Sequence, residues 1–164
     1  MAASPPGTSY MTEPVFVDTN VFVCQSDASD SEKQARADRW CAALWRSRSG
    51  RVSVQVLLEL YATLTRKLKA GIEPSEAREI VSEISAWRPI PVDLSVIRRA
   101  WSLEQRYSLS WWDSLIVAAA QVGQCTVLLT EDLQHGQVFD GVCVVNPFVT
   151  PGHAPEEILR ALAQ

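Results

Sequence analysis

Short runs of apolar, β-branched residues alternate along this chain with longer segments whose apolar residues recur at helical spacing. The runs predict buried strands at residues 14–17, 51–54, 90–92, 126–129 and 142–145. The periodic segments predict helices at residues 31–48, 55–70, 74–88, 94–107 and 110–122, and residues 155–163 fit a further short helix. Strands that alternate with helices usually pair in parallel beneath helices on both faces. The sequence therefore predicts an α/β domain with a central parallel sheet.

The length of 164 residues suffices for one compact domain with a hydrophobic core. We expect residues 13–149 to form this domain and residues 150–164 to form a C-terminal tail. Residues 1–12 are rich in Pro, Ser and Gly and lack the apolar centre of a secretory signal, so we expect them to be disordered. The apolar runs are well short of the ~20 residues that span a bilayer, so no membrane association is expected.

Cysteine and histidine occur in a pattern that argues against a zinc site. The 4 cysteines form no C-x-x-C pair, and the only histidines are His135 and His153. A zinc site of the usual spacing is therefore absent. The same pattern favours a reduced, cytoplasmic setting over that of a disulfide-bonded protein.

Four acidic residues stand where predicted elements begin or end. Asp18 and Asp132 directly follow predicted strands, and Glu59 and Asp113 lie in the first turns of predicted helices. Sites in open α/β sheets form at the carboxyl ends of strands, so this fold can bring the four side chains to one edge. A site made only of carboxylate oxygen suits Mg²⁺ or Mn²⁺ and the chemistry of phosphate esters.

Each of these acids also has a purely structural explanation. Asp18 and Asp132 fit turns or helix caps, which favour Asp. Asp113 fits a capping box with Ser110, three residues before it. Glu59 lacks a basic partner three or four residues later and lies at the edge of its helix's apolar stripe, which modestly favours a functional role. Residue by residue, both interpretations remain open.

The residues beside these acids are assigned no chemistry of their own. Asn20 stands where a haloacid-dehalogenase-type phosphatase has its second Asp, which disfavours that enzyme class. Trp111 and Trp112 favour packing over stacking on RNA bases. His135 favours a role in a loop over that of a general base. Glu131 is a neighbouring carboxylate, but its side chain is expected to point away from the site.

The formal net charge of −4 arises from 19 acidic and 15 basic residues. An acidic protein binds nucleic acid poorly in a nonspecific manner. Setting aside the four candidate ligands leaves equal numbers of acidic and basic residues, and two local basic groups remain: Arg46, Arg48 and Arg51, and Arg66, Lys67 and Lys69. The charge therefore weakens a nucleic-acid hypothesis but still allows it.

Taken together, these pieces resemble the PIN-domain ribonucleases, and more closely the VapC-type toxins of bacterial toxin–antitoxin pairs. The matching segments occur in the family's order across about residues 13–149 and are Pro14–Asn20, Ser53–Tyr61, Ser110–Ala119, Leu128–Gly136 and Val144–Phe148. Each segment alone is a weak signal, whereas all of them in sequence are specific. The resemblance implies a three-layer α/β/α sandwich with a central parallel sheet.

The resemblance also implies roles for individual residues. It carries over Asp18, Glu59 and Asp113 as acidic metal ligands, and it maps Asp132 onto a fourth acidic position that can act through water. The supporting positions that it implies are Thr19 and Asn20 in the strand-end loop and the hydroxyl of Thr130.

The function that the resemblance implies is that of a Mg²⁺- or Mn²⁺-dependent endoribonuclease, acting as the growth-inhibiting toxin of a toxin–antitoxin pair. The implied partners are RNA, a VapB-type antitoxin and a second copy of the chain in a homodimer. A stripe comprising Ile80, Val81, Ile84 and Trp87 fits either that dimer interface or the core. The competing hypothesis is a non-catalytic PIN-like module that binds RNA and an antitoxin. Which RNA is cut and how many metal ions bind stay open.

Overall fold

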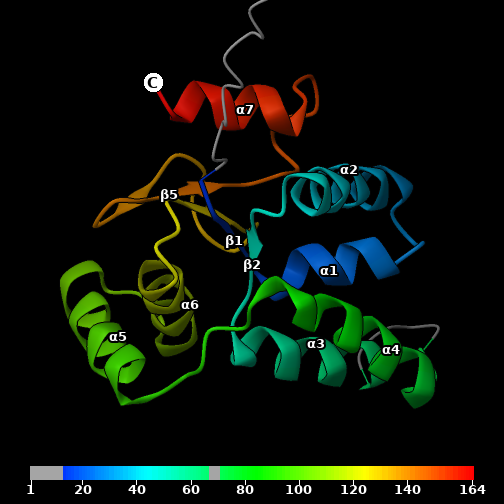
Figure 1. Cartoon of the computed structure of the whole chain (residues 1–164), viewed down its shortest axis with the longest axis horizontal. Helices are drawn as coiled ribbons and strands as arrows, with labels where there is room; N and C mark the ends of the chain where they lie inside the picture. Colours follow the sequence, from blue (N-terminus) through cyan, green and yellow to red (C-terminus); the bar gives the residue numbers. More distant parts are fainter. Residues whose placement is uncertain (1–12, 67–70) are drawn as a thin grey trace, which may run out of the picture.

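The computed structural model describes residues 13–66 and 71–164, which are built around a five-stranded sheet (Figure 1). The strands are β1 (Val15–Val17), β2 (Gly50–Arg51), β3 (Val127–Leu129), β4 (Val138–Phe139) and β5 (Val142–Val145). Their spatial order is β2-β1-β3-β5-β4, with parallel pairing throughout except for the antiparallel edge strand β4. The predicted parallel sheet is confirmed. The expected disorder of residues 1–12 lies outside the described residues.

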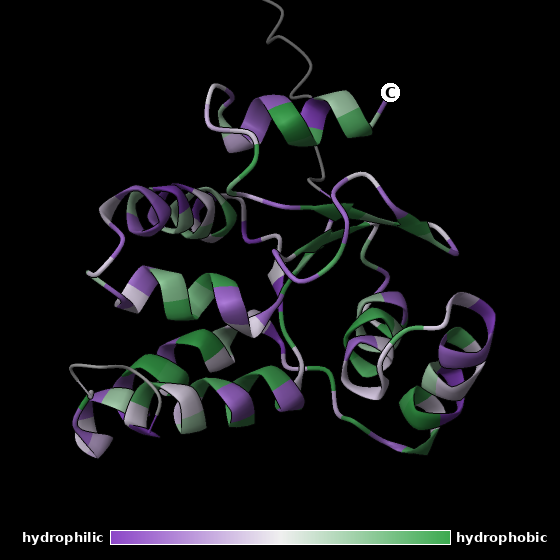
Figure 2. Cartoon of the chain, turned by 180° about the vertical axis from the view of Figure 1, so that it is seen from behind, coloured by the Kyte–Doolittle hydropathy of each residue, from purple (hydrophilic) through white to green (hydrophobic). Residues whose placement is uncertain are grey.

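Helices flank this sheet on both sides. They are α1 (Thr19–Ser26), α2 (Ser31–Ser47), α3 (Val54–Arg66), α4 (Pro74–Ile84), α5 (Leu94–Tyr107), α6 (Trp111–Val122) and α7 (Pro155–Leu162), with a 3₁₀ helix η1 (Ser85–Trp87). Figure 1 shows α1 to α4 on one side of β1 and α5 and α6 on the other, and the opposite view in Figure 2 agrees. The three-layer α/β/α architecture is thus confirmed. In the described part of the chain, no helix combines the length and apolar character needed to cross a membrane.

Helix α1 is absent from the sequence prediction. Its apolar residues Val21, Phe22 and Val23 are consecutive, so they give no helical spacing, and valine has a low helix propensity. The helix forms because Asp18 caps it, its Oδ1 accepting the Thr19 N–H at 2.7 Å, and because Val21 and Phe22 are buried. The helix therefore starts at the carboxyl end of β1.

The strand predicted at 90–92 is wrong as a strand of the sheet. Ile90 makes only an isolated parallel bridge to Ser53, with its N–H donating to the Val52 carbonyl at 2.9 Å. Pro89 and Pro91 have no N–H to donate, so a longer ladder cannot form. The strand predicted at 51–54 is shorter than expected, because Val54 already begins α3.

The hydrophobic core lies between the sheet and its two helical layers. Its central strands are apolar along their length, as the hydropathy colouring of Figure 2 shows. The largest strand side chains are fully buried: Phe16, Leu128, Leu129 and Phe139. Ile84 and Trp87 are also buried, at 6% and 4% exposure. Of the stripe that fits either a dimer interface or the core, Ile84 and Trp87 therefore belong to the core, and Ile80 and Val81 are partly buried against it.

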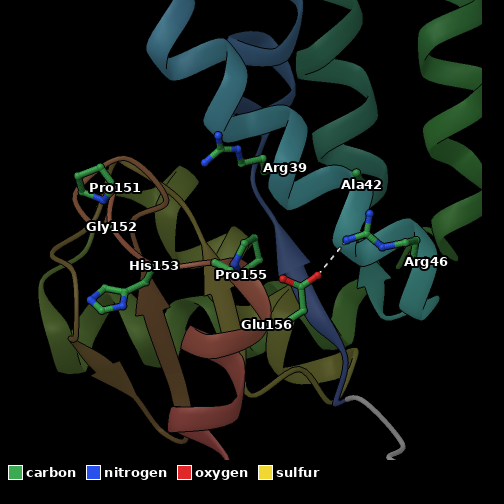
Figure 3. A pocket seen from close by; sticks show the side chains of 9 residues that line it. Arg39, Ala42, Arg46, Pro151, Gly152, His153, Pro155 and Glu156 are labelled. Carbon is green, nitrogen blue, oxygen red and sulfur yellow. Dashed lines mark hydrogen bonds and ion pairs between the residues drawn. The ribbon is translucent and has the colours of Figure 1, made fainter.

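The segment after β5 is fixed to α2 by a buried arginine. The Arg36 guanidinium donates to the backbone carbonyls of Pro147, Pro151 and His153, each at 3.2 Å, and to that of Thr150. A shallow pocket lies between α2 and the start of α7, where an ion pair joins Arg46 to Glu156 (Figure 3). These contacts hold α7 against α2.

Candidate active site

Two of the predicted acids lie at the carboxyl ends of adjacent parallel strands. β1 ends at Val17 and β3 ends at Leu129, and these two residues are paired in register. The Asp18 N–H continues the ladder by donating to the Leu129 carbonyl at 3.0 Å. Asp18 and the loop that contains Asp132 therefore meet at one edge, as predicted from the strand-end rule.

The topology brings the first turns of two helices towards the same edge. α3 begins three residues after β2, so its first turns, which carry Glu59, lie beyond the carboxyl end of that strand. α6 leads into β3 through a short connection and packs on the sheet. Because the end of α6 precedes the start of β3, its first turn, with Asp113, lies towards the opposite, carboxyl edge.

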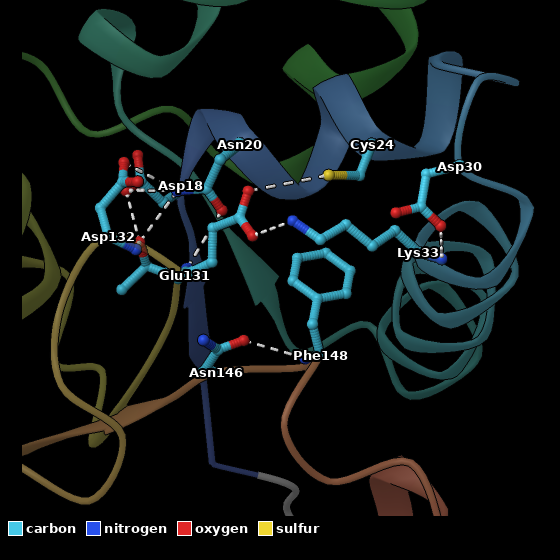
Figure 4. Close-up of polar contacts among 10 residues, drawn as sticks. Asp18, Asn20, Cys24, Asp30, Lys33, Glu131, Asp132, Asn146 and Phe148 are labelled. Atoms are coloured by element: carbon cyan, nitrogen blue, oxygen red, sulfur yellow. Dashed lines mark hydrogen bonds and ion pairs between the residues drawn. The ribbon is translucent and has the colours of Figure 1, made fainter.

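The side-chain amide of Asn20 joins the strand-end residues (Figure 4). Its Nδ2 lies 3.2 Å from Asp18 Oδ2, 3.0 Å from Thr130 Oγ1 and 3.1 Å from Asp132 Oδ2. Its Oδ1 accepts the Glu131 N–H at 3.3 Å, which fixes the amide with its NH₂ group towards the acids. Two amide hydrogens are thus shared among three acceptors, so this group holds two carboxylates at a common position.

The Asp18 carboxyl is buried and carries an unusual pKa. Its pKa is raised from 3.8 to about 7, mainly by burial and in smaller part by the nearby charges of Asp132 and Glu59. Hydrogen bonds from the Thr130 hydroxyl, at 2.8 Å, and from the Thr19 N–H oppose this shift. The ionised form therefore lacks a counter-charge, and a cation at this position would favour it.

Glu59 is held by two residues, one of which the sequence did not indicate. Thr19 Oγ1 donates to Glu59 Oε2 at 3.1 Å, and Gln55 Nε2 donates to Glu59 Oε1 at 2.9 Å. Gln55 is buried, and among the described residues its own amide oxygen has no hydrogen-bond partner. The available signal was its position four residues before Glu59, on the same face of α3.

Half of the predicted capping box forms at Asp113: Ser110 caps the helix, but the Asp113 carboxylate bonds to the Ser110 hydroxyl instead of its backbone N–H. The Asp113 N–H donates to Ser110 Oγ at 3.1 Å, and the Ser110 hydroxyl donates to Asp113 Oδ2 at 2.6 Å. Hydrogen bonds through Asn20 and Thr19 connect Asp18 with Asp132 and Glu59. The hydrogen-bond partner of Asp113 is instead Ser110, three residues before it.

A metal ion fits this site by donor chemistry rather than by a preformed cage. Within residues 13–66 and 71–164, no three His, Cys, Asp or Glu side chains lie close enough together to enclose one. The available donors at this edge are nevertheless carboxylate, hydroxyl and amide oxygens, the ligands that hard cations prefer. The assignment of the four acids as metal ligands stays a prediction.

The neighbouring residues divide between confirmed and wrong predictions. Glu131 does point away, towards Lys33 (Figure 4). His135 does serve its loop, since its Nδ1 accepts the Asn146 N–H at 3.1 Å. Trp111 packs partly against the core, but Trp112 is 62% exposed, so its predicted packing role is wrong. Trp112 lies in the first turn of α6.

Comparison with known proteins identifies this fold. A family model described as the PIN domain matches residues 15–139. A toxin–antitoxin complex from Klebsiella pneumoniae is similar with a TM-score of 0.60 and 19% identity, over 81% of this chain and 97% of that chain. VapC20 of Mycobacterium tuberculosis, a toxin that cleaves the sarcin–ricin loop, is similar with a TM-score of 0.50 and 22% identity, over 70% and 86% of the two chains. No curated protein matches the sequence. Because the family model spans most of its length, the chain belongs to the PIN domain family.

Proposed function

We propose that this chain is a divalent-metal-dependent endoribonuclease and the toxin of a toxin–antitoxin pair. The observation that carries the proposal is the buried Asp18 carboxyl, joined to Asp132 through Asn20 at the carboxyl edge of a PIN domain. The similarity to VapC20, a toxin that cleaves the sarcin–ricin loop, supports RNA as the substrate class. The similarity to a toxin–antitoxin complex supports an antitoxin partner.

The residues proposed to hold Mg²⁺ or Mn²⁺ are Asp18, Glu59 and Asp113, with Asp132 acting through a water molecule. The chemistry that such an ion supplies when bound is neutralisation of charge on the phosphate and a bound water of lowered pKa. A water can then serve as the attacking group, so no side chain is required as a nucleophile. Departure of the 3′-oxygen, which membership of this family implies, leaves a 5′-phosphate and a 3′-hydroxyl.

The other residues of the site orient these carboxylates. Asn20 shares its NH₂ group between Asp18 and Asp132, while Thr19 and Gln55 each donate to one oxygen of Glu59. Such donors restrict the rotation of a carboxylate and leave its remaining lone pairs available to a ligand. These donors support Asp18, Asp132 and Glu59, whereas Asp113 is held by Ser110.

An exposed aromatic side chain adjacent to Asp113 in the sequence supports RNA as the substrate. Trp112 presents an exposed indole next to Asp113, and aromatic faces of this kind stack on unpaired bases. We place a single-stranded region of RNA across this edge, with an unpaired base on Trp112. The proposed protein partners are a VapB-type antitoxin and a second copy of the chain, and the proposed setting is the cytoplasm.

Cleavage of RNA by the purified protein tests the proposal. With Mg²⁺ or Mn²⁺ the protein should cut RNA, and both a chelator and Asp18→Asn should lower the rate by about a hundredfold or more, since charge stabilisation is lost. The matched control is Asp93→Asn, because Asp93 caps α5 through Ser95 and Val96. Equal cleavage by Asp18→Asn and Asp93→Asn preparations would reveal a contaminating nuclease and overturn the assignment.

A non-catalytic module is the second candidate. The capping role of Asp113 and the absence of a three-residue metal cluster in the described part of the chain favour it. The two candidates differ in their response to Mn²⁺, because a metal that binds only the folded state raises the melting temperature. No rise in Tm at millimolar Mn²⁺, combined with no cleavage, would favour the module.

A further inference from the structure

Two adjacent carboxylates after β3 point in different directions. Asp132 Oδ2 accepts from the Asn20 amide at 3.1 Å, at the acidic edge. Glu131 Oε2 instead lies 2.5 Å from Lys33 Nζ, on α2 (Figure 4). The loop thus directs the Asp132 carboxylate towards the site, whereas the Glu131 carboxylate forms an ion pair with Lys33.

Lys33 is well fixed for this contact. Its backbone N–H donates to Asp30 Oδ1 at 3.1 Å, in the N-terminal cap of α2. Its Nζ lies 5.0 Å from the centre of the Phe148 ring, a cation–π distance. The hydrogen bond to Glu131 raises the pKa of Lys33, so the ammonium stays charged across the neutral range.

Glu131 is close to the site through its backbone. Its N–H donates to Asn20 Oδ1 at 3.3 Å, so the residue directly contacts the amide that holds Asp18 and Asp132. Its side chain is 27% exposed and lies 4.0 Å from Cys24 Sγ. In the described part of the chain, Lys33 is the cation bonded to it. A partly buried carboxylate deprived of its cation carries a free-energy cost, which a change of side-chain rotamer can relieve.

We propose that Lys33 is a positioning residue that withholds the Glu131 carboxylate from the acidic edge, so that Asp132 alone faces the metal and substrate from this loop. This role rests on the proposed nuclease function. Without Lys33, Glu131 turns to the acidic edge as a surplus ligand. It then competes with Asp132 for the divalent ion and for the Asn20 amide.

A double-mutant cycle tests this role. Lys33→Met should lower cleavage at saturating Mn²⁺ about tenfold or more, the size of effect seen when groups behind metal ligands are changed. The KM for RNA should stay unchanged, and Mn²⁺ should raise Tm at least as much as in the parent, because a carboxylate is gained. Adding Glu131→Gln to Lys33→Met should restore cleavage, and Lys33→Arg should retain it.

The control is Arg106→Met, which removes an ion pair of α5, that with Asp140 at 2.7 Å, and should leave cleavage unchanged. Full activity in Lys33→Met, or a double variant as impaired as Lys33→Met, would overturn the role of Lys33. Failure of the nuclease assignment is separable, since it shows as undiminished cleavage by Asp18→Asn. If Lys33→Met lowered Tm without metal and Glu131→Gln failed to restore cleavage, the ion pair would be structural only.

Discussion

At the scale of single residues, Asp18 predicts a pH-dependent stability. Its folded-state pKa of about 7 lies above the ordinary value of 3.8, so the folded protein binds this proton more tightly than the unfolded chain does. The resulting stabilisation is fully present below about pH 4 and is lost as the pH rises through about 7. In chelator at pH 8, Asp18→Asn should therefore be more stable than the parent by about 1–3 kcal/mol, with little difference at pH 4.

Urea unfolding of both proteins at several pH values measures this difference. Asp93→Asn is the control of opposite sign, since a hydrogen bond from Ser95 lowers the pKa of Asp93 and its contribution is lost as the pH falls. A parallel loss of stability in the parent and Asp18→Asn between pH 4 and 8 would contradict the assigned pKa. Millimolar Mn²⁺ should reverse the advantage of Asp18→Asn at pH 8.

The sequence indicated individual site residues more readily than the contacts between them. Asp18 and Asp132 follow apolar runs, which is a local signal, and the structure places both at one sheet edge. The Asn20 contact to Asp132 joins residues 112 positions apart, so no local pattern contains it. Gln55 was missed because a buried amide at the edge of an apolar stripe resembles an ordinary helix residue. The exposure of Trp112 depends on how the start of α6 is oriented, which its sequence does not encode.

At the scale of elements, regular periodicity was predictable and irregular backbone was not. Helices α2, α5 and α6 match their predicted spans within about two residues because their apolar residues recur at helical spacing. Helix α1 has no such spacing and depends on its cap and on tertiary burial. Strand β4 is two residues long and arises from the turn through Asp140 and Gly141, both at positive φ. Short elements of this kind depend on contacts made elsewhere in the fold.

The anchoring of the C-terminal segment gives an element-scale prediction. Arg36 is 8% exposed and donates to backbone carbonyls of residues 147–153. Arg36→Leu would leave several of these carbonyls unpaired and should lower the free energy of unfolding by about 2–3 kcal/mol. Limited proteolysis should then cut beyond residue 147 sooner. Arg39→Leu, an exposed position on the same helix, should change neither measurement. Equal effects of the two substitutions would mean that the guanidinium does not anchor this segment.

At the scale of the whole molecule, the parallel strand order brings residues from distant segments of the chain to one edge of the sheet. It places β1 between β2 and β3 in parallel, so the carboxyl ends of these three strands share one edge of the sheet. The residues that follow each strand therefore start from this edge. The strand-end rule made this edge predictable without knowledge of the order. The spacing of Asp113 from the other acids was not predictable, because it depends on how α6 packs over β3 and β5.

The net charge of −4 makes the last prediction one about how the whole molecule holds RNA. Because an acidic protein gains little from releasing counterions, base stacking should carry an unusually large share of the binding free energy. In the Asp18→Asn background, which prevents cleavage, Trp112→Leu should weaken binding of a single-stranded RNA by about 1–3 kcal/mol, while Trp112→Phe retains most of the affinity. Trp101→Leu is the matched control, because Trp101 is 54% exposed on α5.

Fluorescence anisotropy across a salt series separates the stacking contribution to RNA binding from the contribution of ion release. Trp112→Leu should lower the affinity at every salt concentration. It should leave unchanged the slope of log affinity against log salt concentration, since stacking releases no ions. An affinity equal to that of the parent would leave the exposed indole without a role in RNA binding, and an equal loss in Trp101→Leu would point to a nonspecific apolar contribution.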